Sequence, residues 1–269
     1  MSHHTLQRVV FRMLYDPTFA QRVHDGEDIP VTPTERAWLL ATDPRAWSVD
    51  HQRPTRTLHE LSTEFPVSCA LVVGTTRRVD TLRAFFRSPQ FHQTVQNRGS
   101  LDEGFAAYLG SLDLQVPQLP GLLAVEAAKA RCRRELELSP ARLDQASEGD
   151  IWRSRGVGAL QVDASTLDAM NRVEELLFEL TLMPAAGLAS DGPPLPDLPP
   201  LAKEPDQLVL RPAEGDIALA RLGRVVCRTL MALERPAPLE SFAALSGLPE
   251  HVVPQLLADL SRSSLVAQG

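Results

Sequence analysis

The spacing of apolar residues in the first half of the chain predicts helices and no strands. Apolar side chains recur there every three or four residues, which is the spacing of one face of an α-helix. The stripes that carry this spacing run over residues 6–14, 79–86, 101–112 and 119–136. A further apolar stretch over residues 58–73 is interrupted at Phe65-Pro66. Short connections between these stretches favour an all-helical bundle.

One helix start is specified in detail. Thr32 at the N-cap, Pro33 in the first turn and Glu35 at the third position form the pattern of a capping box. The helix that follows is expected to carry Trp38 and Leu39 toward the core.

The middle of the chain is less regular. Residues 151–153 and 159–162 predict two short strands around Gly156 and Gly158. Residues 167–180 then show helical spacing again. Seven prolines follow, which predict an extended linker or a strap along the surface. They are Pro184, Pro193, Pro194, Pro196, Pro199, Pro200 and Pro205.

The last 60 or so residues predict a small module with both helices and strands. Leu208 to Leu210 are expected to form a short strand and Leu265-Val266 another. Between them, apolar spacing predicts helices over residues 219–233, 239–245 and 252–260, with a tight turn at residues 247–249. Helices joined by a glycine-containing turn and followed by a strand have the order of a winged helix.

The fold class expected is therefore mostly α. It comprises an N-terminal helical bundle over residues 1–145, an irregular middle with a proline-rich linker over residues 146–205, and a winged-helix-like module over residues 206–269. A chain of 269 residues is long enough for such a division.

Composition narrows the classes of partner. The net charge of −7 argues against a dedicated binder of nucleic acid or of anionic membranes. The sequence has no apolar run of transmembrane length and no basic-then-apolar start typical of a signal peptide. Three widely separated cysteines fit a reducing compartment. We expect a cytoplasmic protein.

Motifs for catalysis or metal binding are missing from the sequence. The histidines and cysteines lack metal-ligand spacing, so no metal ligand or cofactor is assigned. The stretch from Gly74 to Arg78 lacks the lysine and second glycine of a phosphate-binding loop. Gly156 and Gly158 lack the third glycine of a dinucleotide site. No catalytic residue is assigned, although a scattered triad leaves no trace in sequence.

A winged helix raises the alternative of a transcription regulator that binds DNA. From Gln207 to Gly269 the chain has six arginines and six acidic residues, so the module is net neutral. A DNA reader needs several cations facing phosphates. A neutral module fits a protein or peptide partner better, through strand addition at a sheet edge.

Several stretches between residues 58 and 135 resemble one family when taken in order. They run over residues 64–67, 71–74, 85–91, 98–99, 104–109 and 119–126, and include Phe65-Pro66, Phe85-Phe86 and Tyr108-Leu109. This order is similar to that of the partner proteins of multinuclear non-heme iron oxidases (MNIOs), which modify ribosomally made peptides in methanobactin and thiaglutamate pathways. The proline-rich segment departs from the family's layout.

The resemblance implies a non-catalytic subunit without a cofactor of its own. It implies a heterodimer with a non-heme iron oxidase, which would hold the iron, and recognition of the leader of a precursor peptide. On this basis the partner interface is expected at Phe65, Pro66, Phe105 and Tyr108, although Phe105 fits a core position equally well. The peptide is expected to pair with an edge strand at Leu208, Val209 and Leu210 and to contact Leu256, Leu257 and Leu260. Some of these leucines must face the module's own core.

Overall fold

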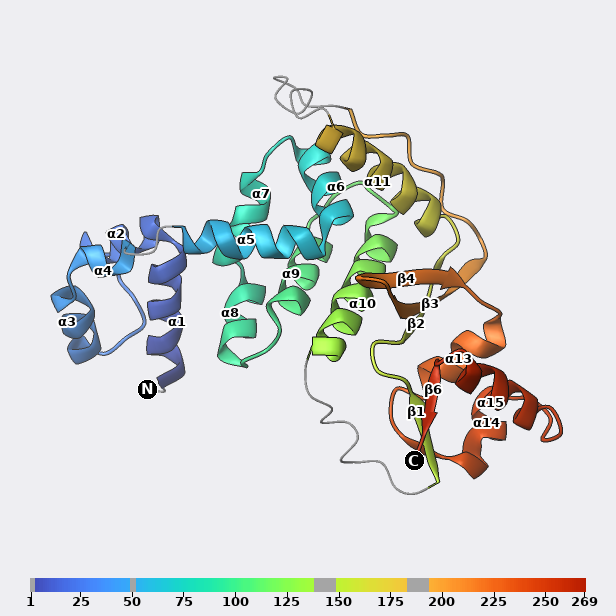
Figure 1. Ribbon diagram of the computed structural model, residues 1–269. Coiled ribbons are helices and arrows are strands. Elements are labelled where there is room, and N and C mark those ends of the chain that lie inside the picture. The colour runs from blue at the N-terminus through green and yellow to red at the C-terminus, as the bar shows by residue number, and fades with distance from the viewer. Residues whose placement is uncertain (1–2, 49–51, 138–148, 183–193) are drawn as a thin grey trace. The chain divides into compact units, whose positions relative to one another are not determined.

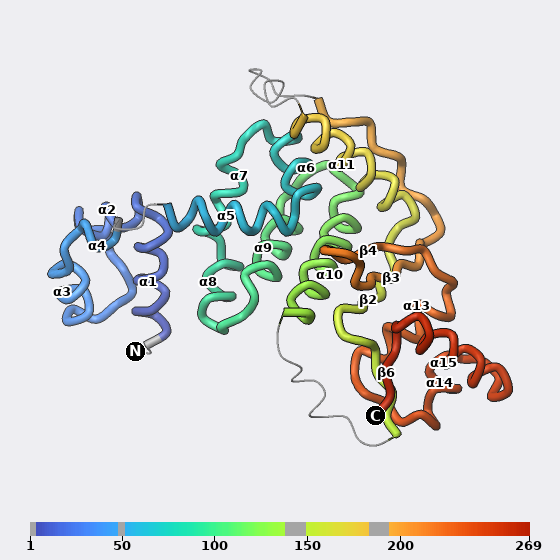
Figure 2. The backbone as a smooth tube through the Cα atoms, viewed as in Figure 1, coloured from blue at the N-terminus to red at the C-terminus, as the bar shows by residue number. Residues whose placement is uncertain are grey.

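The computed structural model describes residues 3–48, 52–137, 149–182 and 194–269. The chain is mostly helical, as the sequence predicts and Figure 1 shows. It also contains two small antiparallel sheets of three strands each. Its contacts divide it into two compact units. Unit 1 comprises Met1–Leu119 and Arg172–Asp197, and unit 2 comprises Pro120–Asn171 and Leu198–Gly269. The chain passes from one unit to the other after Leu119, after Asn171 and after Asp197, and its course can be followed along the trace in Figure 2.

Five of the described helices of unit 1, α2, α3, α4, α6 and α8, begin at a proline. Proline suits the first helical turn because the N–H that it lacks has no partner there. The helices are α1 (His3–Tyr15), α2 (Pro17–His24), α3 (Pro33–Ala41), α4 (Pro44–Ser48), α5 (Arg53–Glu64), α6 (Pro66–Thr76), α7 (Asp80–Arg83), the 3-10 helix η1 (Ala84–Arg87), α8 (Pro89–Gln96) and α9 (Leu101–Gly110). The helical first half is confirmed.

The capping box at the start of α3 forms as predicted. Thr32 accepts a hydrogen bond from the Glu35 N–H, and Glu35 accepts one from the Thr32 N–H at 2.7 Å. Leu39 is buried, but Trp38 is 57% exposed, so the prediction that both point inward is wrong for Trp38. The two are neighbours in sequence, and a helix turns adjacent side chains about 100° apart, so only one can face a narrow core.

Two apolar centres can be described among the placed residues of unit 1. One joins α1, α2 and α3 and contains Met13, Val23 and Leu39. The other is a cluster of aromatic rings in which Phe85 lies 5.1 Å from Phe105 and 5.3 Å from Phe91, measured between ring centroids. The tilted and edge-to-face arrangements in this cluster are those that aromatic rings prefer.

Unit 2 combines both sheets with the remaining helices. Its elements are α10 (Leu119–Glu137), β1 (Asp150–Arg153), β2 (Gly158–Asp163), α11 (Thr166–Leu182, which continues into unit 1), β3 (Pro205–Ala213), β4 (Asp216–Arg221), α13 (Arg224–Ala232), β5 (Ala237–Pro238), the 3-10 helix η3 (Leu239–Ser241), α14 (Phe242–Ser246), α15 (Val253–Arg262) and β6 (Val266–Gln268). The strand orders are β5-β1-β6 and β2-β3-β4.

The sheet β2-β3-β4 is covered on both faces. Leu210 and Ile217 pack with Cys132 of α10, whereas Val209 belongs to the cluster that contains Leu230 of α13. Because side chains of a strand alternate between faces, a strand covered on both sides needs a continuous apolar run. Residues 208–210 supply that run in β3.

Strand β4, which forms a hairpin with β3, lies partly where the sequence predicted a helix. The prediction of a helix from Leu219 onward is wrong, because Leu219 lies in β4 and α13 begins only at Arg224. The turn between β3 and β4 contains Gly215, whose φ of 78° is one that glycine adopts readily. This turn, followed by alternating apolar residues from Asp216 onward, is the signal of a strand.

The C-terminal module begins earlier than residue 206. β1 is the central strand of its sheet: Ile151 pairs with Ala237 of β5 and with Gln268 of β6. Ile151 is 1% exposed and belongs to the same apolar cluster as Phe242 and Leu260. The module therefore depends on residues that the sequence assigned to an irregular middle. The expected boundary between residues 145 and 146 lies outside the described residues.

The described part of the proline-rich segment contains no helix or strand over residues 194–204, as expected for a strap. In unit 1, Leu195 packs against Gly74 of α6 so closely that a Cβ at Gly74 would meet it, and Arg172 donates a hydrogen bond to the Asp197 carbonyl at 2.5 Å. In unit 2, the Ala202 N–H donates to the Asp163 carboxylate at 3.0 Å. Pro184 and Pro193 lie outside the described residues.

Asp216 connects β4 to α10 and provides a test of this packing. Its carboxylate accepts hydrogen bonds from Arg133 at 2.7 and 3.0 Å. Partial burial raises the pKa of Asp216, but the Ile217 N–H, Arg133 and Lys129 together hold it below its ordinary value of 3.8. A carboxyl group whose pKa is lower in the folded state stabilises the fold above its unfolded pKa. That contribution is lost as the pH falls through the folded pKa.

Asp216→Asn is therefore expected to lower the free energy of unfolding at pH 7 by up to about 1 kcal/mol, as for a partly exposed ion pair. The difference from the parent chain should shrink as the pH falls below about 4. Urea unfolding at several pH values measures it, with Glu214→Gln in the adjacent turn as control. A difference that stays constant down to pH 3 would contradict the role of the charge.

Candidate functional site

β4 is one of the two edge strands of the sheet β2-β3-β4, and its outer edge is a candidate site for an extended peptide. β4 pairs with β3 along its whole length, from Asp216 opposite Ala213 to Arg221 opposite Leu208. Within the described ranges, no strand pairs with the other side of β4. An unpaired strand edge is a template for an added strand.

The ladder shows which backbone groups face outward at this edge. The Leu222 N–H donates to the Gln207 carbonyl at 3.0 Å, just beyond the paired residues. Hydrogen-bonded and non-bonded pairs alternate in an antiparallel ladder. The backbone groups of Ala220 therefore face β3, and those of Leu219 face away from it. The strand thus offers outward N–H and C=O groups at every second residue.

β4 has charged residues at both ends and small residues in its centre. Between Asp216 and Arg221, the small residues Ala218 and Ala220 alternate with Ile217 and Leu219, which pack with α10. Arg221 forms an ion pair with Asp206 at 2.6 Å. Charged residues at the ends of an edge strand limit unspecific pairing, while the small residues allow another backbone to approach.

The strand that the sequence predicted to pair with the peptide is not the edge strand β4. Leu208, Val209 and Leu210 are at most 1% exposed and lie in β3, which is paired on both sides, so the expectation of an edge strand there is wrong. The sequence reasoning missed the edge at β4 because it assigned those residues to a helix.

The three leucines expected to contact the peptide lie on one helix, α15. Leu257 and Leu260 are buried in the module's core, as anticipated for part of this set. Leu256 is partly buried and packs against the same core. Of the three, Leu256 retains the most accessible surface.

The exposed face of α15 carries no excess of positive charge. Asp259 accepts a hydrogen bond from Gln255 at 3.1 Å and forms an ion pair with Arg262 at 3.1 Å. Ala258 lies exposed between them. In a winged helix that reads DNA, this helix would face phosphates and bases, where uncompensated cations dominate affinity.

The residues expected at the partner interface divide into core and surface. Phe65 and Phe105 are fully buried, with ring centroids 5.8 Å apart, whereas Pro66 is exposed at the start of α6. Tyr108 is 7% exposed, and its hydroxyl donates to the Thr81 carbonyl at 2.5 Å. Burial raises the pKa of Tyr108 above its ordinary value of 10.0. The aromatic side chains therefore serve the fold, and only Pro66 is freely accessible.

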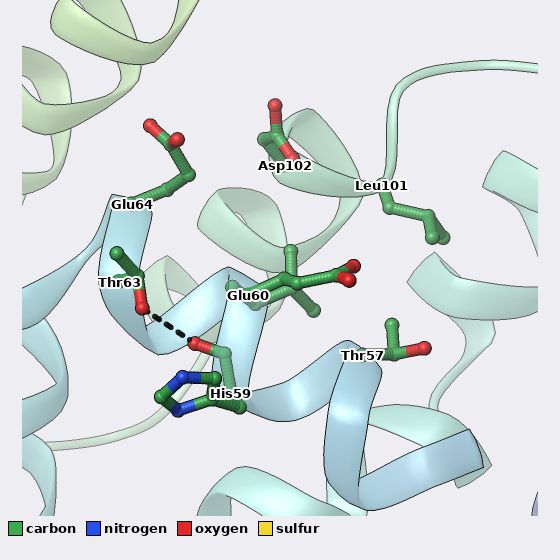
Figure 3. A pocket seen from close by; sticks show the side chains of 8 residues that line it. Thr57, His59, Glu60, Thr63, Glu64, Leu101 and Asp102 are labelled. Atoms are coloured by element: carbon green, nitrogen blue, oxygen red, sulfur yellow. Dashed lines mark hydrogen bonds between the residues drawn. The ribbon is translucent and has the colours of Figure 1, made fainter.

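A separate cleft of about 400 Å³ lies between α5 and the start of α9 (Figure 3). It is lined by Thr57, His59, Glu60, Leu61, Thr63, Glu64, Leu101 and Asp102. In Figure 3 the carboxylates of Glu60, Glu64 and Asp102 point in different directions, and the His59 ring lies apart from them. Acid–base chemistry requires groups that converge on one reacting atom, and these do not.

Residue types that bind metals are present but dispersed. Across the described ranges, no three histidine, cysteine or acidic side chains are grouped so as to hold an ion. Cys69, Cys132 and Cys227 are all buried thiols. Burial raises the pKa of Cys227, which disfavours the reactive thiolate.

Comparison with models of protein families and with curated protein sequences finds no significant match to this chain. Among the described helices, none combines the length and apolar character that crossing a membrane requires.

Proposed function

We propose that this chain is a non-catalytic subunit that binds a multinuclear non-heme iron oxidase and presents the leader of a ribosomally made precursor peptide to it. The observation that carries the proposal is the free edge of β4, with outward backbone groups and small central side chains. The resemblance of residues 58–135 to partner proteins of such oxidases indicates which enzyme would use the bound peptide.

The arrangement of the C-terminal elements supports a winged-helix-like module. The order α13, β5, α14, α15, β6 is compatible with a winged helix, and β1 lies at the centre of the sheet. The core shared by Val209 of β3 and Leu230 of α13 joins this module to the sheet that contains β4. A peptide added to β4 would therefore lie on a firmly packed scaffold.

The physical contribution of such a subunit is to hold the peptide. Binding the leader converts the encounter of substrate and oxidase into a step within one complex, which raises the effective concentration of the residue to be modified. Pairing through main-chain hydrogen bonds needs little side-chain code, so the leader is recognised while the modified segment stays free. The iron and the oxidative chemistry would belong to the oxidase.

Co-expression with a multinuclear non-heme iron oxidase from the same genome tests the heterodimer. The two chains are expected to co-purify in equal amounts, with iron bound to the complex and absent from this chain purified alone. Elemental analysis of both preparations and mass photometry of the complex measure this. A tightly bound metal in the isolated chain, or an oxidase that never co-purifies, would disprove the proposal.

Leader binding at β4 is tested by comparing Leu219→Pro with Leu219→Ala. Both replace the leucine side chain with a smaller one, but only proline removes the outward N–H. We expect Leu219→Pro to weaken binding of a labelled leader peptide about tenfold, and Leu219→Ala by no more than about threefold, since a hydrogen bond contributes about 0.5–1.5 kcal/mol. Fluorescence anisotropy measures both affinities, and circular dichroism checks the fold.

The same titration with a labelled DNA duplex tests the transcription-regulator alternative. Peptide affinity should change little between about 50 and 200 mM salt, whereas a protein with several phosphate contacts loses about a thousandfold or more in that range. Duplex binding that is tight and steeply salt-dependent, without peptide binding, would establish the regulator instead.

A further inference from the structure

Unit 1 contains a second cleft, of about 660 Å³, whose lining is dominated by arginine. Arg78, Arg83 and Arg87 line it, together with a single acidic residue, Asp80. The neighbouring Arg77 adds a fourth cation next in sequence to Arg78. This concentration of positive charge stands out in a chain with a net charge of −7.

The walls of this arginine cleft are fixed by hydrogen bonds and helix ends. Arg77 ends α6 in the left-handed conformation, with its N–H donating to the Val73 carbonyl. The hydroxyl of Tyr108 on α9 donates to the Thr81 carbonyl and so holds α7 against α9. The cleft therefore has a packed floor and a defined position for each arginine backbone.

Two arginines of the cleft already form ion pairs, and these pairs differ in burial. Arg87 forms an ion pair at 3.2 Å with Asp16, which is 2% exposed, yet its own side chain is 58% exposed. Arg83 pairs with Asp80 at 3.2 Å, and both side chains are mostly exposed. Arg87 is thus held in place by a buried carboxylate, while the cleft keeps cationic groups available to a partner.

We propose that the arginine cleft docks an Asp- or Glu-rich segment of the oxidase subunit. Guanidinium groups bind carboxylates strongly through charge-assisted hydrogen bonds, and two arginines of the cleft already form ion pairs with carboxylates. A volume of about 660 Å³ accommodates several side chains. Asp80 within the lining would repel a phosphate dianion more strongly than a single carboxylate. This inference rests on the proposed heterodimer.

Charge reversal at Arg78 and Arg83 tests the docking. The double variant Arg78→Glu/Arg83→Glu is expected to weaken binding to the oxidase at least tenfold, because like charges would then face each other across the interface. Arg98→Glu, an exposed arginine of unit 1 outside the cleft, should change the affinity less than about twofold. Biolayer interferometry at low and moderate salt measures the affinities, and the parent chain should lose affinity as salt rises.

A labelled hexaglutamate peptide provides a second probe that does not require the oxidase. It should bind the parent chain and the Arg98→Glu control but not the double variant, and inorganic phosphate at equal charge should not displace it. If the parent chain fails to bind the oxidase, the heterodimer is wrong, and hexaglutamate alone then decides the chemistry of the cleft. If the double variant binds the oxidase as well as the parent chain does, or if phosphate displaces hexaglutamate, the docking proposal is overturned.

Discussion

Replacing Val209 with proline is expected to unfold the sheet β2-β3-β4 and with it much of unit 2. Val209 is 1% exposed in the central strand, opposite Ala159 on one side and Ala220 on the other. By the alternation set at Gln207, its N–H faces β4, so proline would remove a ladder hydrogen bond and leave a buried carbonyl without its donor. The expected cost exceeds about 3 kcal/mol, a large part of a total stability of about 5–15 kcal/mol.

Val209→Ala is the matched control, because it shortens the side chain and keeps the N–H. It should cost about 2 kcal/mol, as expected for a small core truncation. Urea unfolding followed by circular dichroism compares the two variants. A folded Val209→Pro chain that has lost only peptide binding would show that β3 has a free edge after all, contrary to its pairing on both sides.

Local signals in the sequence predicted the helices well. The capping box from Thr32 to Glu35 and the apolar stripes of the first half depend only on residues close together in the chain, and the structure reproduces them. Trp38 and Val79 are exceptions, since both are exposed and apolar character alone does not say which residues of a stripe face the core. The side chain of Trp38 is 57% exposed, and single exposed apolar residues are common on protein surfaces.

The sheets were harder to predict because their partners are distant in sequence. β1 pairs with strands more than 80 residues later, and nothing in the local pattern of residues 150–153 specifies that pairing. β4 was mistaken for a helix because Leu219, Leu222 and Val226 also fit helical spacing. The turn at Gly215 was the available signal, and it distinguishes the two interpretations only if the turn is recognised first.

These errors in assigning strands also misplaced the predicted peptide-binding edge. A continuous apolar run such as Leu208 to Leu210 is typical of a strand covered on both faces, so it argued for a central strand and against an edge. The sequence therefore predicted an edge at a strand that is central, whereas β4 lies at the border of the same sheet. The arginine cleft could not have been found from spacing alone, since it requires α7 to lie against Tyr108 of α9.

Replacing Phe105 with alanine is expected to destabilise unit 1 by about 3–5 kcal/mol, the usual cost of removing a buried phenylalanine ring. Phe105 is fully buried, and its ring centroid lies 5.1 Å from that of Phe85 and 5.8 Å from that of Phe65. The cavity left behind would be bordered by rings that cannot move into it without breaking their own contacts.

Phe178→Ala on α11 is the control, because Phe178 belongs to the same unit but is 64% exposed. Its removal should change stability by no more than about 0.5 kcal/mol. Chemical denaturation of both variants, with oxidase binding measured below the unfolding transition, separates the role of Phe105 in the core from a role at an interface. A Phe105→Ala chain that keeps full stability yet no longer binds the oxidase would place Phe105 at the interface. If stability falls and the remaining folded molecules still bind, the contact with the oxidase must come from exposed groups such as those of the arginine cleft.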